Sequence, residues 1–473
     1  MSPTRRRRLA RTGVLLVLVV LLAGGAFWIG GGLRSPSRGG PGSAGGQVGT
    51  VRPSTAAEVA AAEAELQQHA WRLRVTTHPA GAALQVRAAS GRTRRGTSPF
   101  AATLRGGHLE LTLTRPGYNR LVQRVTLDRH RSLDLWLDRK GLLHHKLGEL
   151  HSGSNPKQVA FSPDGRQLWV SLLGGHGIEV FDTRTRRRLR EVRLGRHGAV
   201  EVIFTRNGRT VYASQMETAS VWEIDRRTYR VRRKLATGGT WSKVMALSPD
   251  EQTLYVANWV SSDVSVIDLR SGRVRRLLPT VATPRGLWPT PDSRRLYVAG
   301  FDRGELQRID LASGRSKILL RTGGAMRHLV GDPRTGRLYA DDMGTGEAFT
   351  LDLATERVRK LADTDNVPNT IDLSPDGRVL YVSNRGKNGA CYCAPGPEWG
   401  SVLAIDAASG KVLDAMVGGN QTTGLDVSAD GRLLAFSDFL DNRIHLYTVP
   451  AYQVLATGGG GRAVAHKVEL RKP

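Results

Sequence analysis

The feature that most constrains this sequence is a unit of about 42 residues that repeats from about residue 155 to the C-terminal region. Each copy contains a strand-like run that ends in Asp and continues through a turn into a basic strand. This strand end recurs at residues 180–182, 223–225, 266–268, 308–310, 350–352 and 404–406, with a degenerate seventh copy at 445–447. A repeat of this length has to be weighed before any local motif, because each unit buries its faces only against neighbouring units. Seven copies predict seven such elements.

Each unit contains four strand-like runs. In the third copy these are residues 244–247, 253–257, 264–268 and 274–278. A lone four-stranded sheet exposes both faces, whereas a closed ring of sheets buries each face against a neighbour and leaves only short edges. The repeat therefore predicts an all-β, seven-bladed β-propeller over residues 142–473, with residues 141–150 closing the ring. The recurrent Asp is expected to be structural and to accept hydrogen bonds from the turn that follows it.

The units share short motifs. The turn Ser-Pro-Asp-Gly occurs at 162–165 and 374–377, and the strands Leu-Tyr-Val-Ala-Asn and Leu-Tyr-Val-Ser-Asn occur at 254–258 and 380–384. This pattern resembles the YVTN or YncE-like β-propeller repeat, and the resemblance covers about residues 155–460. It implies a propeller in a periplasmic or cell-surface protein, and it implies no particular ligand.

A different pattern occupies residues 71–138. Apolar residues alternate there with period two, as in Leu109, Leu111 and Leu113, which predicts about six short strands in a small β-sandwich. The segments Pro-Ala-Gly-Ala at 79–82, Gly-Thr-Ser-Pro at 96–99 and Pro-Gly-Tyr at 116–118 resemble the landmarks of PEGA domains, with Ala80 in place of the family's Glu. The resemblance implies a surface-associated interaction module without catalytic residues.

The N-terminus predicts a membrane anchor. Residues 1–12 contain five arginines, and residues 13–32 are an uncharged run of about 20 residues, which as a helix is long enough to cross a bilayer. Positive charge before the span predicts a single-pass inner-membrane protein with a cytoplasmic tail and extracytoplasmic, periplasmic domains. A cleaved signal peptide is the alternative, although the run has no clean small-x-small site. Residues 33–70 predict a flexible linker that ends in one short helix.

The net charge of +27 has two interpretations. Five of the charges belong to the N-terminal arginines and the others are spread through nearly every turn, which is typical of solvated turns in an arginine-rich protein. The alternative is attraction to polyanions, which outside the cytoplasm would be anionic lipid, lipopolysaccharide or cell-wall polymer. The sequence lacks zinc-finger spacing, a basic helix and RNP-type aromatic residues, so we expect no nucleic-acid partner.

The sixth repeat carries an insertion of about 12 residues between its second and third strands. A long loop on a rigid scaffold is a favourable place for a binding site. Its candidate ligand-binding residues are Asn384, Arg385, Lys387, Glu398 and Trp399. The only two cysteines, Cys391 and Cys393, lie in the same loop. Outside the cytoplasm a disulfide between them is favoured chemically, and free thiols or a metal-binding or reactive role are the alternatives.

The connections between blades are expected on the same face as this insertion. Their polar residues are further candidates, namely Arg285, Arg327, His328, Asn369, Asn420 and Gln421, together with Asn155, His197, Trp241 and Lys243. Each of them alone is better explained as a strand cap or a water-binding group. Together they would form a concave, mainly cationic mouth suited to an anionic or sugar-like molecule.

Three functions fit these features. The leading hypothesis is a membrane-anchored recognition or scaffold protein, rather than an enzyme, that binds an envelope polymer or a protein partner with the propeller face. The alternatives are a lactonase-like propeller hydrolase and a thiol-redox protein that uses the cysteine pair. The predicted inner strands begin with Asn and Arg rather than acids, and the sequence lacks a phosphate-binding Gly-rich loop, a Gly-x-Ser-x-Gly elbow and a His-Glu-x-x-His helix. We therefore expect no catalytic residues, no metal and no cofactor.

Overall fold

The computed structural model describes residues 64–458 and 460–473. The predicted cytoplasmic tail at 1–12, the membrane anchor at 13–32 and most of the linker at 33–70 lie outside the described residues. Within the linker, residues 64–68 are helical, where the sequence predicts a short helix. In the described part of the chain, no helix is long and apolar enough to cross a membrane.

The first folded part is a small β domain of two sheets. Its strands are β1 (Ala70–His78), β2 (Ala83–Ala88), β3 (Thr93–Thr97), β4 (Phe100–Arg105), β5 (Gly107–Thr114), β6 (Leu121–Leu127) and β7 (Arg131–Trp136). The sheets have the strand orders β4-β1-β7 and β3-β2-β5-β6. Leu109, Leu111 and Leu113 of β5 are buried in one core with Leu73 and Leu127. The period-two alternation thus correctly predicted strands, although seven form rather than about six.

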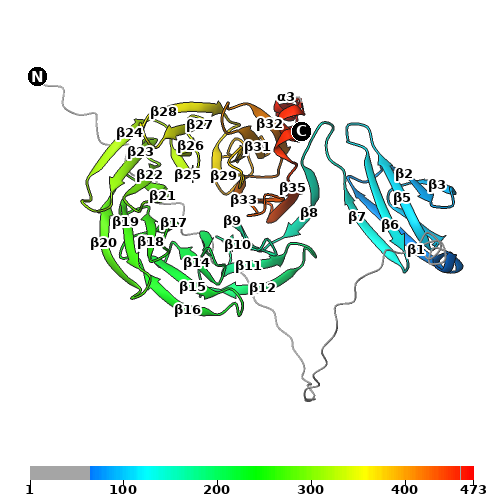
Figure 1. The fold of residues 1–473 in the computed structure, drawn as a ribbon, viewed down its shortest axis with the longest axis horizontal. Coiled ribbons are helices and arrows are strands. Elements are labelled where there is room, and N and C mark those ends of the chain that lie inside the picture. The colour runs from blue at the N-terminus through cyan, green and yellow to red at the C-terminus, as the bar shows by residue number, and fades with distance from the viewer. Residues whose placement is uncertain (1–63, 459) are drawn as a thin grey trace, which may run out of the picture. The chain divides into compact units, whose positions relative to one another are not determined.

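Seven four-stranded antiparallel sheets, the blades, follow one another around a ring (Figure 1). Blade 1 consists of β9 (Pro156–Phe161), β10 (Gln167–Leu172), β11 (Gly177–Asp182) and β12 (Arg188–Arg193), and blade 2 of β13 (Glu201–Phe204), β14 (Thr210–Gln215), β15 (Ser220–Asp225) and β16 (Val231–Ala236). Blade 3 consists of β17 (Ser242–Leu247), β18 (Thr253–Asn258), β19 (Asp263–Asp268) and β20 (Arg273–Pro279), and blade 4 of β21 (Pro284–Pro289), β22 (Arg295–Gly300), β23 (Glu305–Asp310) and β24 (Ser316–Arg321). Blade 5 consists of β25 (Met326–Asp332), β26 (Arg337–Asp342), β27 (Glu347–Asp352) and β28 (Val358–Asp363). Blade 6 consists of β29 (Pro368–Leu373), β30 (Val379–Asn384), β31 (Ser401–Asp406) and β32 (Val412–Val417). Blade 7 consists of β33 (Thr422–Val427), β34 (Leu433–Asp438), β35 (Arg443–Thr448) and β8 (His145–His151).

The ring is closed by a strand from the other end of the chain. Blade 7 has the order β33-β34-β35-β8, and β8 pairs antiparallel with β35 from Arg443 opposite His151 to Thr448 opposite His145. This closure agrees with the prediction for residues 141–150. It also gives every blade four strands.

A large buried side chain at the third position of the second strand joins each of the first six blades to the next. These residues are Trp169, Tyr212, Tyr255, Tyr297, Tyr339 and Tyr381. Each belongs to an apolar cluster with residues of the following blade, as Tyr255 does with Leu287 and Leu296. Fully burying an apolar side chain of this size stabilises a protein by about 1.5–3 kcal/mol. The faces between blades therefore supply the core that the repeat predicted.

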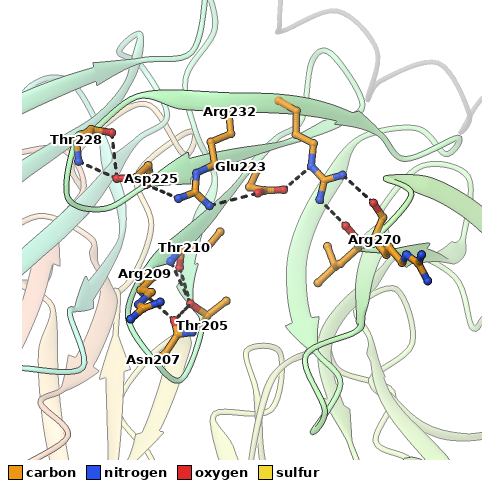
Figure 2. Close-up of polar contacts among 11 residues, drawn as sticks. Thr205, Asn207, Arg209, Thr210, Glu223, Asp225, Thr228, Arg232 and Arg270 are labelled. Atoms are coloured by element: carbon orange, nitrogen blue, oxygen red, sulfur yellow. Dashed lines mark hydrogen bonds and ion pairs between the residues drawn. The ribbon is translucent and has the colours of Figure 1, made fainter.

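The Asp that ends the third strand of blades 1 to 6 holds the next turn. Asp225 Oδ1 accepts hydrogen bonds from the Thr228 backbone N–H at 2.8 Å and from its hydroxyl at 3.0 Å, and Arg232 pairs with the same carboxylate (Figure 2). These bonds lower the pKa of Asp225 to about 2, with the Thr228 N–H making the largest contribution. Asp182, Asp268, Asp310, Asp352 and Asp406 make the equivalent bond to the backbone N–H three residues later. The predicted structural role of this residue is confirmed.

Two short helices follow blade 7 and pack against β32 of blade 6, namely α2 (Tyr452–Thr457) and α3 (Arg462–Glu469). A buried polar network lies at the same blade. Asp414 Oδ2 accepts the backbone N–H groups of Leu143 and His144 at 2.9 and 3.0 Å, and it lies 2.8 Å from His144 Nδ1. The other ring nitrogen of His144 lies 3.1 Å from the Tyr381 hydroxyl. This network fixes the segment that leads into β8.

Candidate functional site

One residue of each innermost strand lies at the same level of the propeller axis. It is the second residue of the strand, or in blade 2 the residue directly before β13. This inner ring comprises Lys157, Val200, Lys243, Arg285, Arg327, Asn369 and Thr423. Five of the seven, all except Lys243 and Thr423, line a cavity of about 30 Å³ where the innermost strands converge. Four of the seven positions are cations, and three of these, Lys157, Arg285 and Arg327, line the cavity.

A second ring lies at the turn after the second strand of each blade. This rim comprises Leu173, Met216, Trp259, Phe301, Met343, Arg385 and Phe439. In six blades the backbone N–H of the rim residue donates to the carbonyl directly before the innermost strand, at 2.9 to 3.1 Å, as Trp259 does to Trp241. This recurrent hydrogen bond places the rim beside the inner ring. The rim is apolar except at blade 6, where Arg385 takes the position.

Cations of the inner ring lie on aromatic rings of the rim. The Lys243 Nζ is 3.7 Å from the centroid of the Trp259 ring, and the Arg285 guanidinium is 5.3 Å from the same ring. The Phe439 ring belongs to blade 7, and its centroid lies 5.6 Å from Lys157 Nζ and 6.0 Å from the Arg385 guanidinium. A cation over an aromatic face is attracted by the ring quadrupole by about 0.5–2 kcal/mol. These contacts hold the cations in place without neutralising them.

Five cations thus gather at the channel, and we call Lys157, Lys243, Arg285, Arg327 and Arg385 the cationic cluster. The three arginines are only 6% to 7% exposed. Burial, and then the neighbouring cations Arg327, Arg285, Arg385 and Lys243, lower the pKa of Lys157 well below its usual value. Burial lowers the pKa values of Arg285 and Arg385 to about 10. Among the residues that the structure describes, none of the five forms an ion pair, so the cluster holds concentrated positive charge.

Two buried acids lie close to the cluster but do not balance it. Burial raises the pKa of Glu201 to about 8 and that of Asp341 to about 7. Glu201 accepts the Met245 backbone N–H of the next blade, and Asp341 accepts the His328 backbone N–H at 2.7 Å. Both carboxyls therefore serve the ring as hydrogen-bond acceptors and carry little negative charge below pH 7. Burial, together with Arg327, lowers the pKa of His328 to about 4, so His328 is neutral.

The hydrogen bonds of the arginines leave donor capacity in the channel. Arg327 Nε donates to the Asn369 carbonyl at 2.8 Å, and its Nη1 lies 3.7 Å from the Met343 sulfur. Arg385 Nη2 donates to Gln421 Oε1. Within the described part of the chain, the buried Arg385 Nε and Asn369 Oδ1 have no hydrogen-bond partner. Both atoms therefore retain the capacity to form a hydrogen bond with another group.

The insertion of blade 6 reaches the cluster through one residue. Cys391 and Cys393 form a disulfide, and Tyr392 between them is 58% exposed. The Tyr392 ring lies 5.1 Å from the Arg385 guanidinium, and its carbonyl accepts a hydrogen bond from Gln421 Nε2 at 3.2 Å. The disulfide therefore belongs to the turn that holds an aromatic ring over the cationic cluster.

The structure brings some of the predicted site residues together and separates others. Arg285, Arg327, His328, Asn369, Arg385 and Gln421 lie at the channel, as does Lys243. Lys387 pairs with Glu398 at 3.2 Å, Trp399 packs on Lys472, and Lys472 also binds Asn420, so these residues fasten the insertion to the C-terminal segment. Asn384 is completely buried inside blade 6, where it donates to Val382 and Ser401.

Sequence reasoning missed several residues of the channel, among them Lys157, Glu201, Trp259 and Phe439. The repeat itself contains the signal that finds the basic ones. Lys243, Arg285 and Arg327 are spaced by 42 positions, and Lys157 lies two units of 43 before Lys243. Residues at the same position of each repeat lie at the same height along the propeller axis. Basic residues at one such position on the innermost strands must therefore converge on the channel.

The comparisons with known proteins support a YNCE-like β-propeller. A family model described as YNCE-like beta-propeller matches residues 207–414. Antigen Lp49 of Leptospira interrogans serogroup Icterohaemorrhagiae serovar copenhageni (strain Fiocruz L1-130) is 51% identical over 82 residues, which are 17% of this chain and 18% of that protein. The match thus spans less than a fifth of the relative's length.

Among solved structures, Kuenenia stuttgartiensis Hydrazine Synthase is similar with a TM-score of 0.55 and 20% identity, covering 63% of this chain and 96% of that chain. This likeness concerns the fold alone. The resemblance of the small β domain to PEGA domains stays a prediction.

Proposed function

We propose that this protein is an extracytoplasmic recognition protein whose propeller binds an anionic group of an envelope polymer or protein at the cationic cluster. The observation that carries the proposal is that five cations converge on one channel, with the three arginines buried, and that none has an ion-pair partner among the described residues. A buried charge costs several kcal/mol unless it is paired. A bound anion would offset that cost, and guanidinium groups match oxyanions in geometry.

The sign of the charge supports recognition of an anion over metal-dependent hydrolysis. Divalent metals such as Ca²⁺ and Mg²⁺ require several ionised or carbonyl oxygen ligands that converge on one point. The charged residues described at this channel are mainly cations, and its two acids, Glu201 and Asp341, have raised pKa values. Repulsion between the cluster and a divalent cation would weaken such a site.

The binding proposal is tested by titrating the full-length protein, kept in solution with a non-ionic detergent, with sodium sulfate in a calorimeter. Wild type is compared with Arg327→Gln, which removes one buried charge, and with Arg187→Gln, which removes an exposed charge from a turn of blade 1. We expect Arg327→Gln to weaken binding by at least about tenfold, because a hydrogen bond to a charged group contributes about 1.5–3 kcal/mol. Arg187→Gln should bind as wild type does.

Equal weakening by both substitutions would mean that the net charge attracts sulfate diffusely, and the proposal would then be wrong. Once the site is established, the same variants are compared for retention of lipopolysaccharide, peptidoglycan and anionic vesicles. A natural partner that uses the cluster should be retained by Arg187→Gln and lost by Arg327→Gln.

We also propose that residues 13–32 anchor the protein in the inner membrane and that the propeller lies on the extracytoplasmic side. The uncharged run and the arginines before it support this orientation. The test is to wash membranes with alkaline carbonate and to treat intact spheroplasts with protease. Retention in the washed membrane with cleavage of the propeller is expected. Release by the wash would indicate a cleaved signal peptide, and protection from protease would contradict the orientation.

A further inference from the structure

We infer that the anionic group is a terminal phosphomonoester carried on a ring, with the phosphate among the cationic cluster and the ring on the aromatic side chains of the rim. The inference rests on the proposed function, since it specifies the ligand of the same site. It covers a free phosphorylated sugar or aromatic compound as well as the phosphorylated end of an envelope glycan. The shared chemistry is a ring with an apolar face and one phosphate at its edge.

The size of the cavity limits what enters the channel. The cavity among the innermost strands holds about 30 Å³ and is lined by Lys157, Arg285, Arg327 and Asn369. A single water needs about 10–15 Å³ measured in this way, so the space corresponds to two or three waters. One charged end group fits there, while the body of a ligand has to stay above it. This favours a terminal group over the internal diesters of a polymer chain.

The donors and acceptors at the cavity suit a phosphate. Lys157, Arg285 and Arg327 line the space, and Arg385 Nε, outside this lining, is buried without a hydrogen-bond partner among the described residues. The wall also contains an acceptor without a partner among the described residues, Asn369 Oδ1. A phosphomonoester has a second pKa near 6, so it carries a hydroxyl donor in part of the neutral range. A sulfate ester and a carboxylate carry no such proton, and they would leave this acceptor unmatched.

Above the cavity, aromatic residues form two clusters on opposite arcs of the ring. On blades 3 and 4, Trp241 and Trp259 enclose Lys243, and the Phe301 ring lies 4.9 Å from that of Trp259. On blades 6 and 7, Tyr392 and Phe439 flank Arg385. Tyr392 is exposed and the other four aromatic residues are partly exposed, so part of each side chain is in contact with solvent. A charged group without a ring would leave this apolar surface in water.

The experiment titrates the full-length protein with four probes: methyl phosphate, phenyl phosphate, glucose 1-phosphate and glucose. We expect a ring-bearing phosphate to bind about tenfold more tightly than methyl phosphate, because stacking on an aromatic side chain has about this effect. Glucose should not bind measurably. Preference for glucose 1-phosphate would identify a sugar end, and preference for phenyl phosphate an aromatic compound.

Two variants locate the ring on the rim. Trp259→Leu and Phe439→Leu, on opposite arcs, should each be tested, and at least one should reduce the preference for the ring-bearing probe over methyl phosphate to less than threefold. Trp222→Leu, in the third strand of blade 2, is the matched control and should retain the preference. Thermal unfolding of each variant shows whether it is folded.

The outcomes separate this inference from the proposed function. If methyl phosphate binds as tightly as the ring-bearing phosphates to the wild type, the ring has no role and the inference is wrong, while the anion site stands. If sulfate binds more tightly than methyl phosphate at pH 6, the assignment to phosphate is wrong. If no probe and no sulfate binds, the proposed function fails as well.

Discussion

Replacing Arg285 by Met should stabilise the unliganded protein. Burial lowers the pKa of Arg285 from 12.5 to about 10. Because one pKa unit corresponds to about 1.4 kcal/mol, keeping this side chain charged in the folded protein costs about 3 kcal/mol. Methionine fills a similar volume without charge. The substitution loses the cation–π contact with Trp259, which contributes about 1 kcal/mol. The expected net gain is about 2 kcal/mol.

The assay is thermal unfolding of the full-length protein at low ionic strength, with and without sulfate. A gain of about 2 kcal/mol should raise the Tm of Arg285→Met by about 3 °C. Sulfate at 100 times its Kd should stabilise wild type by about 2.7 kcal/mol through binding. Arg285→Met should gain much less, because its site has lost a cation. Arg187→Met, with an exposed charge removed, should behave as wild type in both conditions.

Sulfate also stabilises proteins in general because it is excluded from their surface. That contribution is common to all three proteins, so the comparison cancels it. Two results would refute the reasoning: a Tm of Arg285→Met below that of wild type without sulfate, or the same sulfate-induced shift in both. The first would mean that the charge of Arg285 is balanced within the fold, and the second that sulfate does not bind at the cluster.

Three further perturbations follow from the same structure. The affinity for sulfate, measured by calorimetry, should fall from pH 6 to pH 9, because Glu201 and Asp341, with pKa values of about 8 and 7, become anionic over this range. In Glu201→Gln this fall should be smaller. A rise in affinity would contradict the placement of sulfate beside these two carboxyls. Reduction of the disulfide should weaken binding of ring-bearing phosphates more than that of methyl phosphate, because Tyr392 loses its position; equal effects on both would exclude this role. Asp414→Ala should lower the free energy of unfolding in urea by about 3 kcal/mol, because it leaves His144 buried without its partner; a loss below about 1 kcal/mol would contradict this role.

The propeller could be predicted from the sequence because the four-strand pattern of a blade recurs in consecutive units of about 42 residues. Each of the first six copies carries a strand that ends in Asp, and the hydrogen bond that the Ser271 backbone N–H donates to Asp268 shows why that residue recurs. Closure by β8 could also be predicted, since a seventh copy with only three strands needs a fourth. The N-terminal anchor was not tested, because it lies outside the described residues.

The channel was predicted only in part, and the reason is geometrical. Arg285 and Arg327 start their strands and were recognised by that position. Lys157 holds the same strand position and was missed, while Trp259 belongs to a turn; closure of the ring brings Lys157 to the cavity, and Trp259 lies beside Arg285. Conversely, Asn384 and Trp399 lie at the two ends of the insertion that contains Arg385, but neither lies at the channel. Asn384 is the last residue of β30 and pairs with Ser401 inside the blade.

The pairing of β8 with β35 sets the order in which the protein can be completed during synthesis. β8 is made before any full blade, and its partner is the last strand of the propeller. Six blades can stack as they are made, but until β35 follows, the first and last blades each present an uncovered face and β8 has no neighbour. A chain that stops within blade 7 is therefore left with the same open ends as one that stops several blades earlier. Late truncations should be as damaging as early ones, and the nascent protein depends on protection from aggregation until its final strands are made.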